Sequence, residues 1–410
     1  MYKSSFTMSG GDEPPIDLSY EPHLRQAGGA SRFRAFHHLE RTLAEDAPRL
    51  PYEVFEERST RHWGQRKLLL AEVEFLTECA PAAAGGLVVY AGAAPGTHVA
   101  LLAELFPALR FMCVDPRPFE LTASPRVELR QEFFTDELAE ELAGRHEPLL
   151  LFVSDVRTAD PRVQREPEAL EAAVAADQAR QMGWVLRLRP AASLLKFRLP
   201  WGEGRSRYLR GEVRLPVWGR PSTTETRLLC LGAPEMAEYE HLRYNEQLCH
   251  FNRVARVDYY DHPTLLEPDS DHCYDCAAED LILRRYLGRL SAAPSHEEVQ
   301  RLARRVTRGC SSHSRTSARR RQFRPLLFDY ERRTVTEMPE EGAPVSEERS
   351  AFGQQVARDA AARLEGEGEL RYAPVSERQA QEAEAAAREC GATARRTPLG
   401  DGSWSVHVSK

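Results

Sequence analysis

The sequence lacks any apolar run of the roughly 18 residues that a membrane-spanning helix requires. Its first eleven residues are too polar for a secretory signal peptide. An overall basic excess is also missing, because the formal net charge is −7. This balance argues against a general nucleic-acid coat and leaves any such contact to local patches. With 410 residues, 42% of them hydrophobic, the chain suits one large globular domain and a smaller one.

Cysteine is sparse and irregularly spaced. Several of the eight cysteines lie within apolar runs, which indicates free thiols in a reducing compartment rather than a disulfide framework. His272 with Cys273-x-x-Cys276 resembles half of a zinc site. The pair Cys249-His250 does not have the spacing of a second half, so we expect ordinary thiols and no bound metal.

One basic patch lies between Gln300 and Phe328. It contains nine arginines and no acidic residue. Its middle, residues 310–318, has no hydrophobic periodicity and indicates a linker. The patch is interpreted either as a solvated linker or as a sequence-independent track for RNA phosphates.

The most informative motif is a glycine-rich turn at 87–98, Leu-Val-Val-Tyr-Ala-Gly-Ala-Ala-Pro-Gly-Thr-His. A short buried strand leads into this turn and a helix follows it, as in nucleotide-binding α/β domains. Gly92 and Gly96 permit close approach of the backbone to a ligand. Pro95 and the missing third glycine exclude the dinucleotide fingerprint. Asp115 ends the next apolar run, about 20 residues on, where an acid binds ribose hydroxyls. The combination favours S-adenosylmethionine (SAM).

Strand and helix patterns alternate, which predicts an α/β fold with a mostly parallel, doubly wound sheet of the Rossmann-like class. Helices are expected at Phe33–Glu45, Gly64–Cys79, Val99–Leu105, Asp136–Gly144 and Glu166–Arg187. Strands are expected at Leu87–Ala91, Phe111–Asp115, Val127–Arg130, Leu149–Ser154, Ala192–Phe197 and Thr226–Leu231, with an irregular loop between the last two. Ligands collect at the carboxyl ends of such strands.

Composition divides the chain into four parts. Residues 1–16 are expected to be disordered, 17–309 to form the α/β domain, 310–324 to be a basic linker, and 325–410 to form a small α+β domain of unknown function. For the last part the patterns predict strands at Pro325–Tyr330 and Thr334–Glu337, helices at Ser346–Arg363 and Glu377–Cys390, and strands near Thr393 and Trp404.

Four charged residues, Lys67, Asp155, Lys196 and Glu225, lie on the first strong helix or at strand ends. Each alone is ordinary for a solvated element end. Together, in this order, they resemble the Lys-Asp-Lys-Glu tetrad of RNA ribose 2′-O-methyltransferases. A ribose hydroxyl is a weak acid, so its methylation needs a base and a positive field. We expect Lys196 to be the base, Asp155 and Glu225 to orient it, and Lys67 to lower its pKa and position the hydroxyl.

Further motifs extend this resemblance over roughly residues 17–309. They are Ser19-Tyr-Glu-Pro22, Gly64-Gln-x-Lys-Leu-Leu-Leu70, Val88-Val-Tyr-x-Gly-x-Ala-Pro-Gly-Thr-His98, Ser154-Asp-Val-Arg157, Ser193-x-x-Lys-x-Arg198, Glu225-x-Arg-Leu-Leu229 and Val257-Asp-Tyr-Tyr, followed by a helix near 280–287. In this order they resemble the poxvirus family of messenger-RNA cap-specific 2′-O-methyltransferases. Members of that family are also the small, processivity-conferring subunit of the viral poly(A) polymerase.

The resemblance implies a SAM-dependent 2′-O-methyltransferase domain that binds capped mRNA and a poly(A) polymerase catalytic subunit, without a membrane. The expected location is the virion or host cytoplasm if the chain is viral, and otherwise that of a soluble intracellular protein. The implied SAM contacts are Gln65, Tyr90, Gly92, Gly96, His98, Asp115, Arg117, Phe133 or Phe134, and Arg157. The implied cap contacts are the rings of Tyr20 and Trp201 and the carboxylates of Glu203 and Glu240. Aromatic faces and carboxylates favour a methylated guanine because methylation makes the base cationic.

Some points differ from the family or stay open. Glu246 is an alternative to Glu240, since the spacing to Phe251 differs. The loop before Glu225 has Pro221-Ser-Thr-Thr where the family offers a tyrosine near the cap, and the region after 310 has no counterpart. A ribosomal-RNA 2′-O-methyltransferase would also carry the tetrad. A third reading is a non-catalytic, RNA-binding stimulatory subunit of a poly(A) polymerase.

Overall fold

The structure of the chain is a computed structural model. It describes residues 33–51, 64–81, 85–160, 163–164, 166–219, 223–263, 272–291, 293–311, 326–337, 370–375, 393–398 and 404–409. The chain divides after Met338 into two compact units. Residues 326–337 therefore belong to the first unit, whereas the sequence analysis groups them with the C-terminal part.

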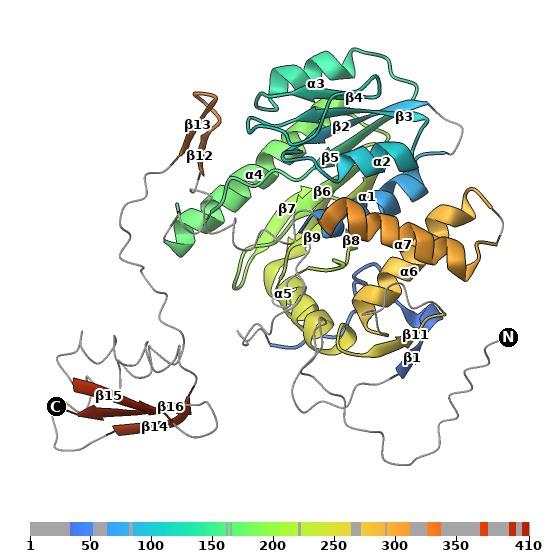
Figure 1. The fold of residues 1–410 in the computed structure, drawn as a ribbon. Coiled ribbons are helices and arrows are strands. Elements are labelled where there is room, and N and C mark those ends of the chain that lie inside the picture. Colours follow the sequence, from blue (N-terminus) through green and yellow to red (C-terminus); the bar gives the residue numbers. More distant parts are fainter. Residues whose placement is uncertain are drawn as a thin grey trace. The chain divides into compact units, whose positions relative to one another are not determined.

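A seven-stranded sheet forms the centre of the first unit (Figure 1). Its strands, in spatial order, are β4 (Val127–Arg130), β3 (Leu109–Val114), β2 (Gly86–Ala91), β5 (Leu150–Ser154), β6 (Ala192–Phe197), β9 (Thr226–Leu231) and β8 (Glu212–Arg214). The first five are parallel, and β9 runs antiparallel to both of its neighbours. Every residue of β2 and β6 is buried, so both faces of the sheet need a covering layer.

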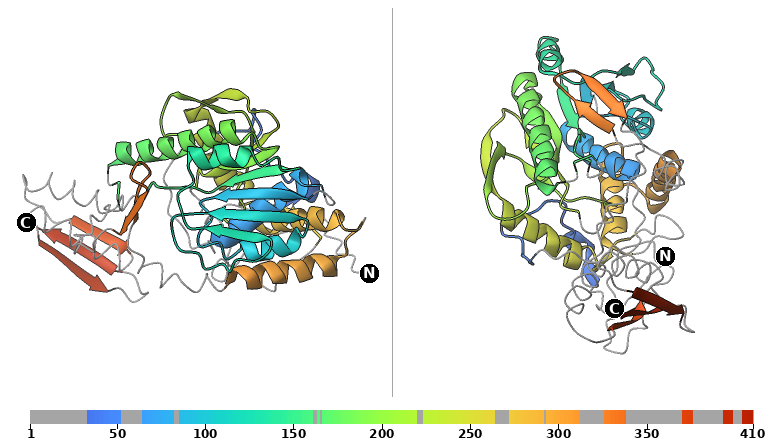
Figure 2. Two further views of the ribbon diagram at one scale, coloured as in Figure 1. Left: turned by 90° about the horizontal axis from the view of Figure 1, so that it is seen from above. Right: turned by 90° about the vertical axis from the view of Figure 1, so that its left-hand side faces the viewer.

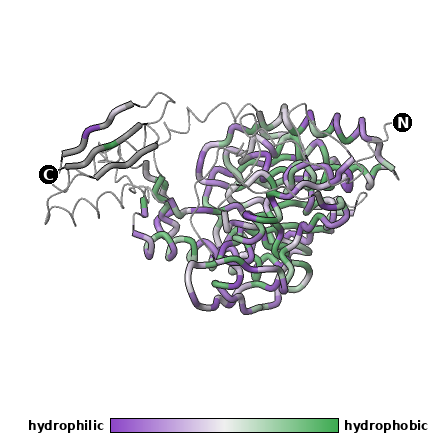
Figure 3. Tube along the Cα trace, turned by 90° about the horizontal axis from the view of Figure 1, so that it is seen from below, coloured by the Kyte–Doolittle hydropathy of each residue, from purple (hydrophilic) through white to green (hydrophobic). Residues whose placement is uncertain are grey.

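Helices supply that layer on both faces (Figure 2). Helices α1 (Gly64–Cys79) and α2 (Val99–Leu105) lie on one face, and α3 (Asp136–Ala143) and α4 (Pro167–Leu188) on the other. Helix α6 (Tyr274–Gly288) packs against α1, and α7 (His296–Ser311) packs against α6. In α1 the buried residues Leu69, Val73 and Leu76 recur at helical spacing. Green, hydrophobic stretches accordingly occupy the interior of this unit in Figure 3.

Smaller elements flank the sheet. Strands β7 (Arg205–Leu209) and β10 (Met236–Glu240) form an antiparallel ribbon. Helix α5 (His241–His250) leads into a short π-helix (Phe251–Ala255). Strand β11 (Tyr259–Asp261) pairs with β1 (Phe33–Ala35), and a 3-10 turn (Phe36–His38) follows β1. Tyr244 on α5 donates a hydrogen bond to the carbonyl of Thr224 at 2.7 Å, which fixes the segment just before β9.

The expected α/β architecture with a mostly parallel sheet is confirmed, as are the helices and strands expected between Gly64 and Leu231 apart from small shifts at their ends. The helix expected at Phe33–Glu45 is wrong. Phe33–Ala35 is a strand paired with β11, and Thr42 bridges to Arg214, because backbone pairing with distant segments overrides local helical preference. The expected irregular loop between β6 and β9 instead contains β7 and β8.

One hairpin and one three-stranded sheet account for the strands described near the C-terminus. Strands β12 (Leu326–Asp329) and β13 (Thr334–Glu337) pair in the first unit, as expected. In the second unit β14 (Leu370–Val375), β16 (Trp404–Ser409) and β15 (Thr393–Pro398) form an antiparallel sheet in that order. Strands β15 and β16 confirm the expectation near Thr393 and Trp404, and β14 was not expected. The helices expected at 346–363 and 377–390, and the expected disorder of residues 1–16, lie outside the described residues.

Buried ion pairs join α6 to the body of the first unit. Two nitrogens of Arg66 on α1 donate to the two carboxylate oxygens of Glu279 on α6 at 2.9 and 2.6 Å. The side chains are 3% and 0% exposed. Trp218 Nε1 donates to the same carboxylate at 2.7 Å. A buried pair of this kind is expensive to break, because the remaining charge loses its partner without regaining water.

We therefore expect Glu279→Ala to destabilise the first unit by about 3–5 kcal/mol. The measurement is denaturant unfolding followed by tryptophan fluorescence. Glu297→Ala is the matched control, because Glu297 pairs with Arg301 at 3.6 Å while both side chains are mostly exposed, and exposed pairs contribute little. Equal unfolding midpoints for the two variants would contradict the structural role assigned to Glu279.

Candidate active site

The candidate site lies where the parallel strands end. Gly92 follows β2, Asp115 follows β3, Asp155 follows β5, and Lys196 is the penultimate residue of β6. Because these strands are parallel, their carboxyl ends meet at one edge of the sheet. The chain runs from β2 through β3 to β4 in one direction, then from β5 to β6 in the other. Such a reversal opens a crevice at the strand ends, where ligands bind in sheets of this kind.

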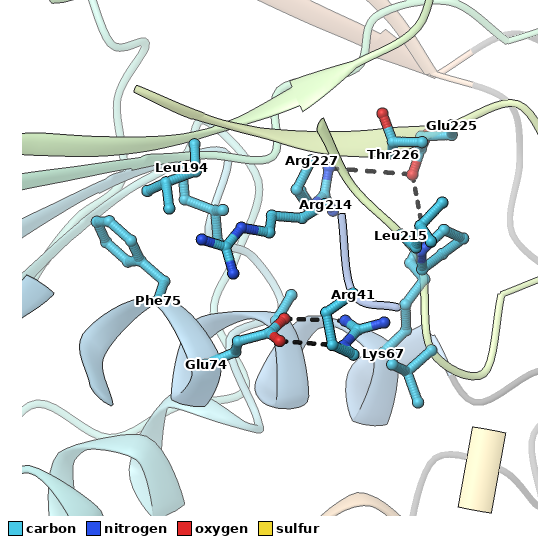
Figure 4. Close-up of a pocket in the computed structure, with 14 residues that line it drawn as sticks. Arg41, Lys67, Glu74, Phe75, Leu194, Arg214, Leu215, Glu225, Thr226 and Arg227 are labelled. Atoms are coloured by element: carbon cyan, nitrogen blue, oxygen red, sulfur yellow. Dashed lines mark hydrogen bonds and ion pairs between the residues drawn. The ribbon is translucent and has the colours of Figure 1, made fainter. Parts of the chain in front are cut away.

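The four residues of the predicted tetrad are brought together there. Lys196 Nζ lies 3.1 Å from Asp155 Oδ1 and 3.4 Å from Glu225 Oε2. Lys67, projecting from α1, lies 2.9 Å from the other oxygen of Glu225. Figure 4 shows Lys67 and Glu225 beside a cavity of about 20 Å³. Glu225 thus joins the two lysines, and Asp155 contacts only one of them.

Two arginines complete the cluster. Arg227 Nη2 donates to Asp155 Oδ1 at 2.5 Å, and Arg157 lies 3.5 Å from Glu225 Oε2. The family resemblance implies that Arg157 contacts SAM, and it implies no role for Arg227. A signal for Arg227 was available, because residues 225 and 227 alternate along a strand and so share a face. With Lys196 protonated, the cluster holds four cations and two carboxylates, an excess of positive charge.

Lysine itself is rare in this chain. The whole sequence contains four lysines against 51 arginines, and two of the four are Lys67 and Lys196. Arginine holds a positive charge as well as lysine does, but it does not release its proton in proteins. The presence of lysine at these two positions, in a chain that otherwise uses arginine, indicates that the site needs either a group that can release a proton or a compact ammonium.

Burial lowers the pKa of Lys196 below the ordinary lysine value. Arg157 and Arg227 act in the same direction, whereas Asp155 and Glu225 oppose the shift. Burial alone would raise the pKa of Asp155, but Lys196 and Arg227 outweigh it and hold that pKa at about 2. Burial of Glu225 is likewise outweighed, by Lys196 and Lys67, and its pKa lies well below the usual range. At neutral pH both carboxylates are therefore charged, and Lys196 releases its proton more readily than an ordinary lysine does.

The glycine turn is backed by a buried polar network. Tyr90 donates to Glu72 Oε1 at 2.7 Å, and His98 Nε2 lies 3.0 Å from Glu72 Oε2. His98 Nδ1 lies 2.7 Å from Gln65 Oε1, which also accepts from Thr97. Tyr90 and His98 are each 1% exposed. Three predicted SAM contacts, Gln65, Tyr90 and His98, thus belong to a buried network that supports the glycine turn. Glu72, the fourth member of this network, was not predicted from the sequence.

A small pocket lies in front of the turn. It has a volume of about 20 Å³, and its lining includes Gly92, Asp115, Arg117, Phe134 and Arg157 among the predicted SAM contacts. At Gly92, with φ +78°, a Cβ would come within 2.8 Å of the backbone nitrogen of Val156, so only glycine allows this packing. Gly96 also has a positive φ, +75°, and lies outside the lining of this pocket.

Asp115 is the acceptor at the centre of this pocket. Its carboxylate, 2% exposed, accepts from the backbone nitrogen of Ala94 at 3.0 Å. Arg117 donates to it from its backbone nitrogen at 2.9 Å, from Nε at 2.9 Å and from Nη2 at 2.7 Å. Phe133 points elsewhere and packs edge-on against Tyr330, with ring centroids 4.7 Å apart. Of the two alternatives from sequence, Phe134 is the one in the pocket.

Three of the predicted cap residues, Trp201, Glu203 and Glu240, lie at one end of the β7–β10 ribbon. Trp201 and Glu203 are exposed and lie in the turn before β7. The ribbon register pairs Glu240 with Arg205, which brings Glu240 next to this turn. Asn245 Nδ2 on α5 donates to the carbonyl of Pro200 at 2.8 Å and supports the turn.

Glu246, the alternative carboxylate, is held by Arg49 at 2.6 Å, so the geometry favours Glu240. Tyr20 lies outside the described residues. Within the described part of the chain, no three possible metal ligands cluster together, and no described helix is both long and apolar enough to cross a bilayer.

Comparison with known proteins gives a family match. Residues 42–266, more than half of the chain, match the family described as "Poly A polymerase regulatory subunit". A cap-specific mRNA (nucleoside-2′-O-)-methyltransferase of myxoma virus (strain Lausanne) is 29% identical over 213 residues, covering 48% of this chain and 62% of that protein. The protein of the same name from fowlpox virus (strain NVSL) is 29% identical over 184 residues, covering 40% and 57%. The chain thus spans about three fifths of the length of these curated relatives.

Among solved structures, bluetongue virus VP4 is a match, and its structure is described as revealing a multifunctional RNA-capping production line. The TM-score is 0.31 and the identity 12%, over 65% of this chain and 46% of that one.

The charge cluster predicts how Lys196 titrates. Asp155 opposes the lowering of the Lys196 pKa, so Asp155→Asn should lower that pKa further. Titration by NMR of lysine-labelled protein measures this directly, because four lysines give four signals and Lys196→Arg identifies one of them. Glu171→Gln is the control, since Glu171 pairs with Arg198 rather than with Lys196. An unchanged or raised pKa of Lys196 in Asp155→Asn would contradict the assigned contact.

Proposed function

Because the chain belongs to the poly(A) polymerase regulatory subunit family, we propose that it catalyses the reaction for which its poxvirus relatives are named. That reaction is methylation of capped mRNA on a ribose 2′-hydroxyl. The proposed methyl donor is SAM, and the proposed acceptor is the first transcribed nucleotide. A poly(A) polymerase catalytic subunit is the proposed protein partner.

The observation that carries this proposal is the position of Lys196. Its ammonium is largely buried, touches both Asp155 and Glu225, and has a lowered pKa. A buried lysine with a lowered pKa is a suitable general base near neutral pH. A ribose hydroxyl is far too weak an acid to lose its proton to water, so such a base is what 2′-O-methylation requires.

In the proposed reaction the neutral amine of Lys196 would accept the proton of the 2′-hydroxyl while the O–CH3 bond forms and the S–CH3 bond of the methyl donor breaks, leaving a neutral thioether. Asp155 and Glu225 orient Lys196 and stabilise the ammonium that results. The positive charges of Lys67, Arg157 and Arg227 stabilise the negative charge that develops on the ribose oxygen. The positive charges that lower the pKa of Lys196 are those of Arg157 and Arg227. Lys67 pairs with Glu225, and we assign it to positioning the ribose hydroxyl.

The residues that line the pocket in front of the glycine turn suit the nucleoside part of SAM. Asp115, buried at the end of β3, is the acceptor for the ribose hydroxyls, and Gly92 keeps the turn free of side chain. When bound, SAM supplies an electrophilic methyl group on its sulfonium sulfur. Arg157 both lines this pocket and contacts Glu225, which supports placing donor and acceptor side by side.

The strand order supports a Rossmann-like methyltransferase class. The order of the five parallel strands reverses between β2 and β5, and one antiparallel strand, β9, lies between β6 and β8. Glu225 opens that antiparallel strand, so the insertion brings the last tetrad residue to the edge of the sheet where parallel strands end.

The central prediction concerns Lys196→Arg, which keeps the charge but removes a releasable proton. Transfer of labelled methyl from SAM to capped RNA should fall at least about 100-fold, the usual effect of losing a general base, while binding of SAM and of a cap analogue stays unchanged. Methyl transfer by Lys196→Met should fall by the same factor. If Lys196→Arg kept more than about a tenth of the activity, Lys196 would act by charge and not as the base.

The family description also favours a second role as a poly(A) polymerase subunit. This role needs no tetrad, so Lys196→Arg separates the two. The variant should stimulate tail elongation by a poly(A) polymerase catalytic subunit as well as the unmodified chain does. Loss of both activities together would indicate a shared RNA-binding fault rather than a lost base.

Cap recognition distinguishes this proposal from a ribosomal-RNA methyltransferase. Trp201 is 40% exposed and lies near Glu203 and Glu240, which suits a cationic methylated guanine. The full-length chain should bind a cap-analogue resin and be released by methylated but not by unmethylated guanine nucleotide. Trp201→Ala should weaken binding by about 5- to 100-fold, the range for one lost base–aromatic stack. Release by both nucleotides alike would favour the ribosomal alternative.

A further inference from the structure

The hairpin β12–β13 lies beyond the family-like segment, which ends at residue 266, yet it belongs to the first unit. Side chains alternate between the two faces of a strand, and here the alternation separates Leu327 from Phe328 and Tyr330. Leu327 is 41% exposed. Phe328 and Tyr330 are partly buried and contact the first unit. The hairpin therefore has an aromatic inner face.

Tyr330 anchors this inner face. Its ring lies 4.7 Å from that of Phe133 and 6.3 Å from that of Trp184 between centroids, and the guanidinium of Arg180 lies 4.2 Å from its centroid. At the tip, Arg333 pairs with Glu137 on α3 at 3.0 Å. Contacts with both α3 and α4 fix where the hairpin meets the sheet edge, next to α4 in Figure 1.

Phe328 and Tyr330 line the same pocket as Gly92, Asp115 and Phe134. The glycine turn and β3 end form the inner wall of this pocket, and the hairpin forms the outer wall. The volume between them is about 20 Å³, room for a single water molecule. A ligand held by Asp115 must therefore displace a side chain, and its outer surface must meet the hairpin.

Arg117 is the side chain that a ligand would displace. Its guanidinium is held by the carboxylate of Asp115 and lies 6.0 Å from the centre of the Phe328 ring. A guanidinium is flat, like a purine, and donates hydrogen bonds, like a ribose. Arg117 thus uses the two partners, an acidic acceptor and an aromatic face, that an adenosine needs. Its side chain is 36% exposed, so it has a path into solvent.

We propose that Phe328 and Tyr330 form the outer wall of the purine subsite of the SAM pocket, with Phe328 facing the purine in place of Arg117. This inference rests on the proposed function, because it takes the pocket to be the SAM site. It assigns part of the cofactor site to a segment that begins at the end of the arginine-rich stretch and lies outside the family-like region.

The test is calorimetric binding of S-adenosylhomocysteine to the full-length chain and its variants. Phe328→Ala should weaken binding by about 5- to 100-fold, as expected for one base–aromatic stack, and should weaken the binding of adenosine by the same factor. Phe328→Tyr should restore most of the affinity. Leu327→Ala, on the outer face of the same strand, is the matched control and should bind normally. Binding of a cap analogue should be unchanged in all variants, which shows that they are folded.

Two results would overturn the inference in different ways. If the unmodified chain binds S-adenosylhomocysteine but Phe328→Ala binds it equally well or more tightly, the hairpin is not a wall of the purine subsite. In that case the proposed methyltransferase function stands. If the unmodified chain binds neither S-adenosylhomocysteine nor SAM, the proposed function fails and the inference fails with it. Asp115→Ala, which removes the ribose acceptor, provides the reference for a lost contact in this pocket.

Discussion

Lys196 lies between two carboxylates, with Nζ 3.1 Å from Asp155 and 3.4 Å from Glu225, and the surrounding elements hold this contact in place. A buried lysine either pairs its ammonium with negative charges or loses the proton and becomes neutral. Strands β5 and β6 supply Asp155 and Lys196 as direct neighbours in the sheet, and the antiparallel strand β9 brings Glu225 from the opposite direction. If either carboxylate were absent, the lysine would deprotonate or the site would open to water. The topology of the sheet is thus inseparable from the charge state of one side chain.

Composition gives this contact additional weight. A chain with 51 arginines and four lysines has filled nearly every cationic position with arginine, including the structural pairs Arg66–Glu279 and Arg256–Asp275. Those pairs need a permanent charge and the forked geometry of the guanidinium. Lys67 and Lys196 differ in what they require. Arginine at residue 196 would keep a positive charge beside Asp155 and Glu225 but would lose the ability to exchange a proton, which is what the proposed function requires of this residue.

Much of this site could be predicted from the sequence, because strand ends in a parallel sheet converge. The glycine turn, Asp115, Asp155 and Lys196 each follow from an apolar run that stops at a polar residue. Two kinds of feature could not be read in that way. Glu72 lies on α1, and only the fold shows that it binds both Tyr90 and His98, neither of which lines the pocket in front of the turn. The strand at Phe33–Ala35 has no local signal either, since its pairing with β11 joins residues more than 200 positions apart.

The two acids around the glycine turn show where a ligand can enter. Glu72 is held by Tyr90 and His98. Both of these side chains are almost completely buried, so neither has a path into solvent. Asp115 is held by the side chain of Arg117, which is about one third exposed. Water can solvate the guanidinium of Arg117 when it leaves, and Asp115 then keeps the backbone N–H donors of Ala94 and Arg117. Asp115 therefore has an exchangeable partner and Glu72 a permanent one. In the proposed exchange at Asp115, the buried network around Glu72 would hold the glycine turn in place, so that the ligand would meet a preorganised surface.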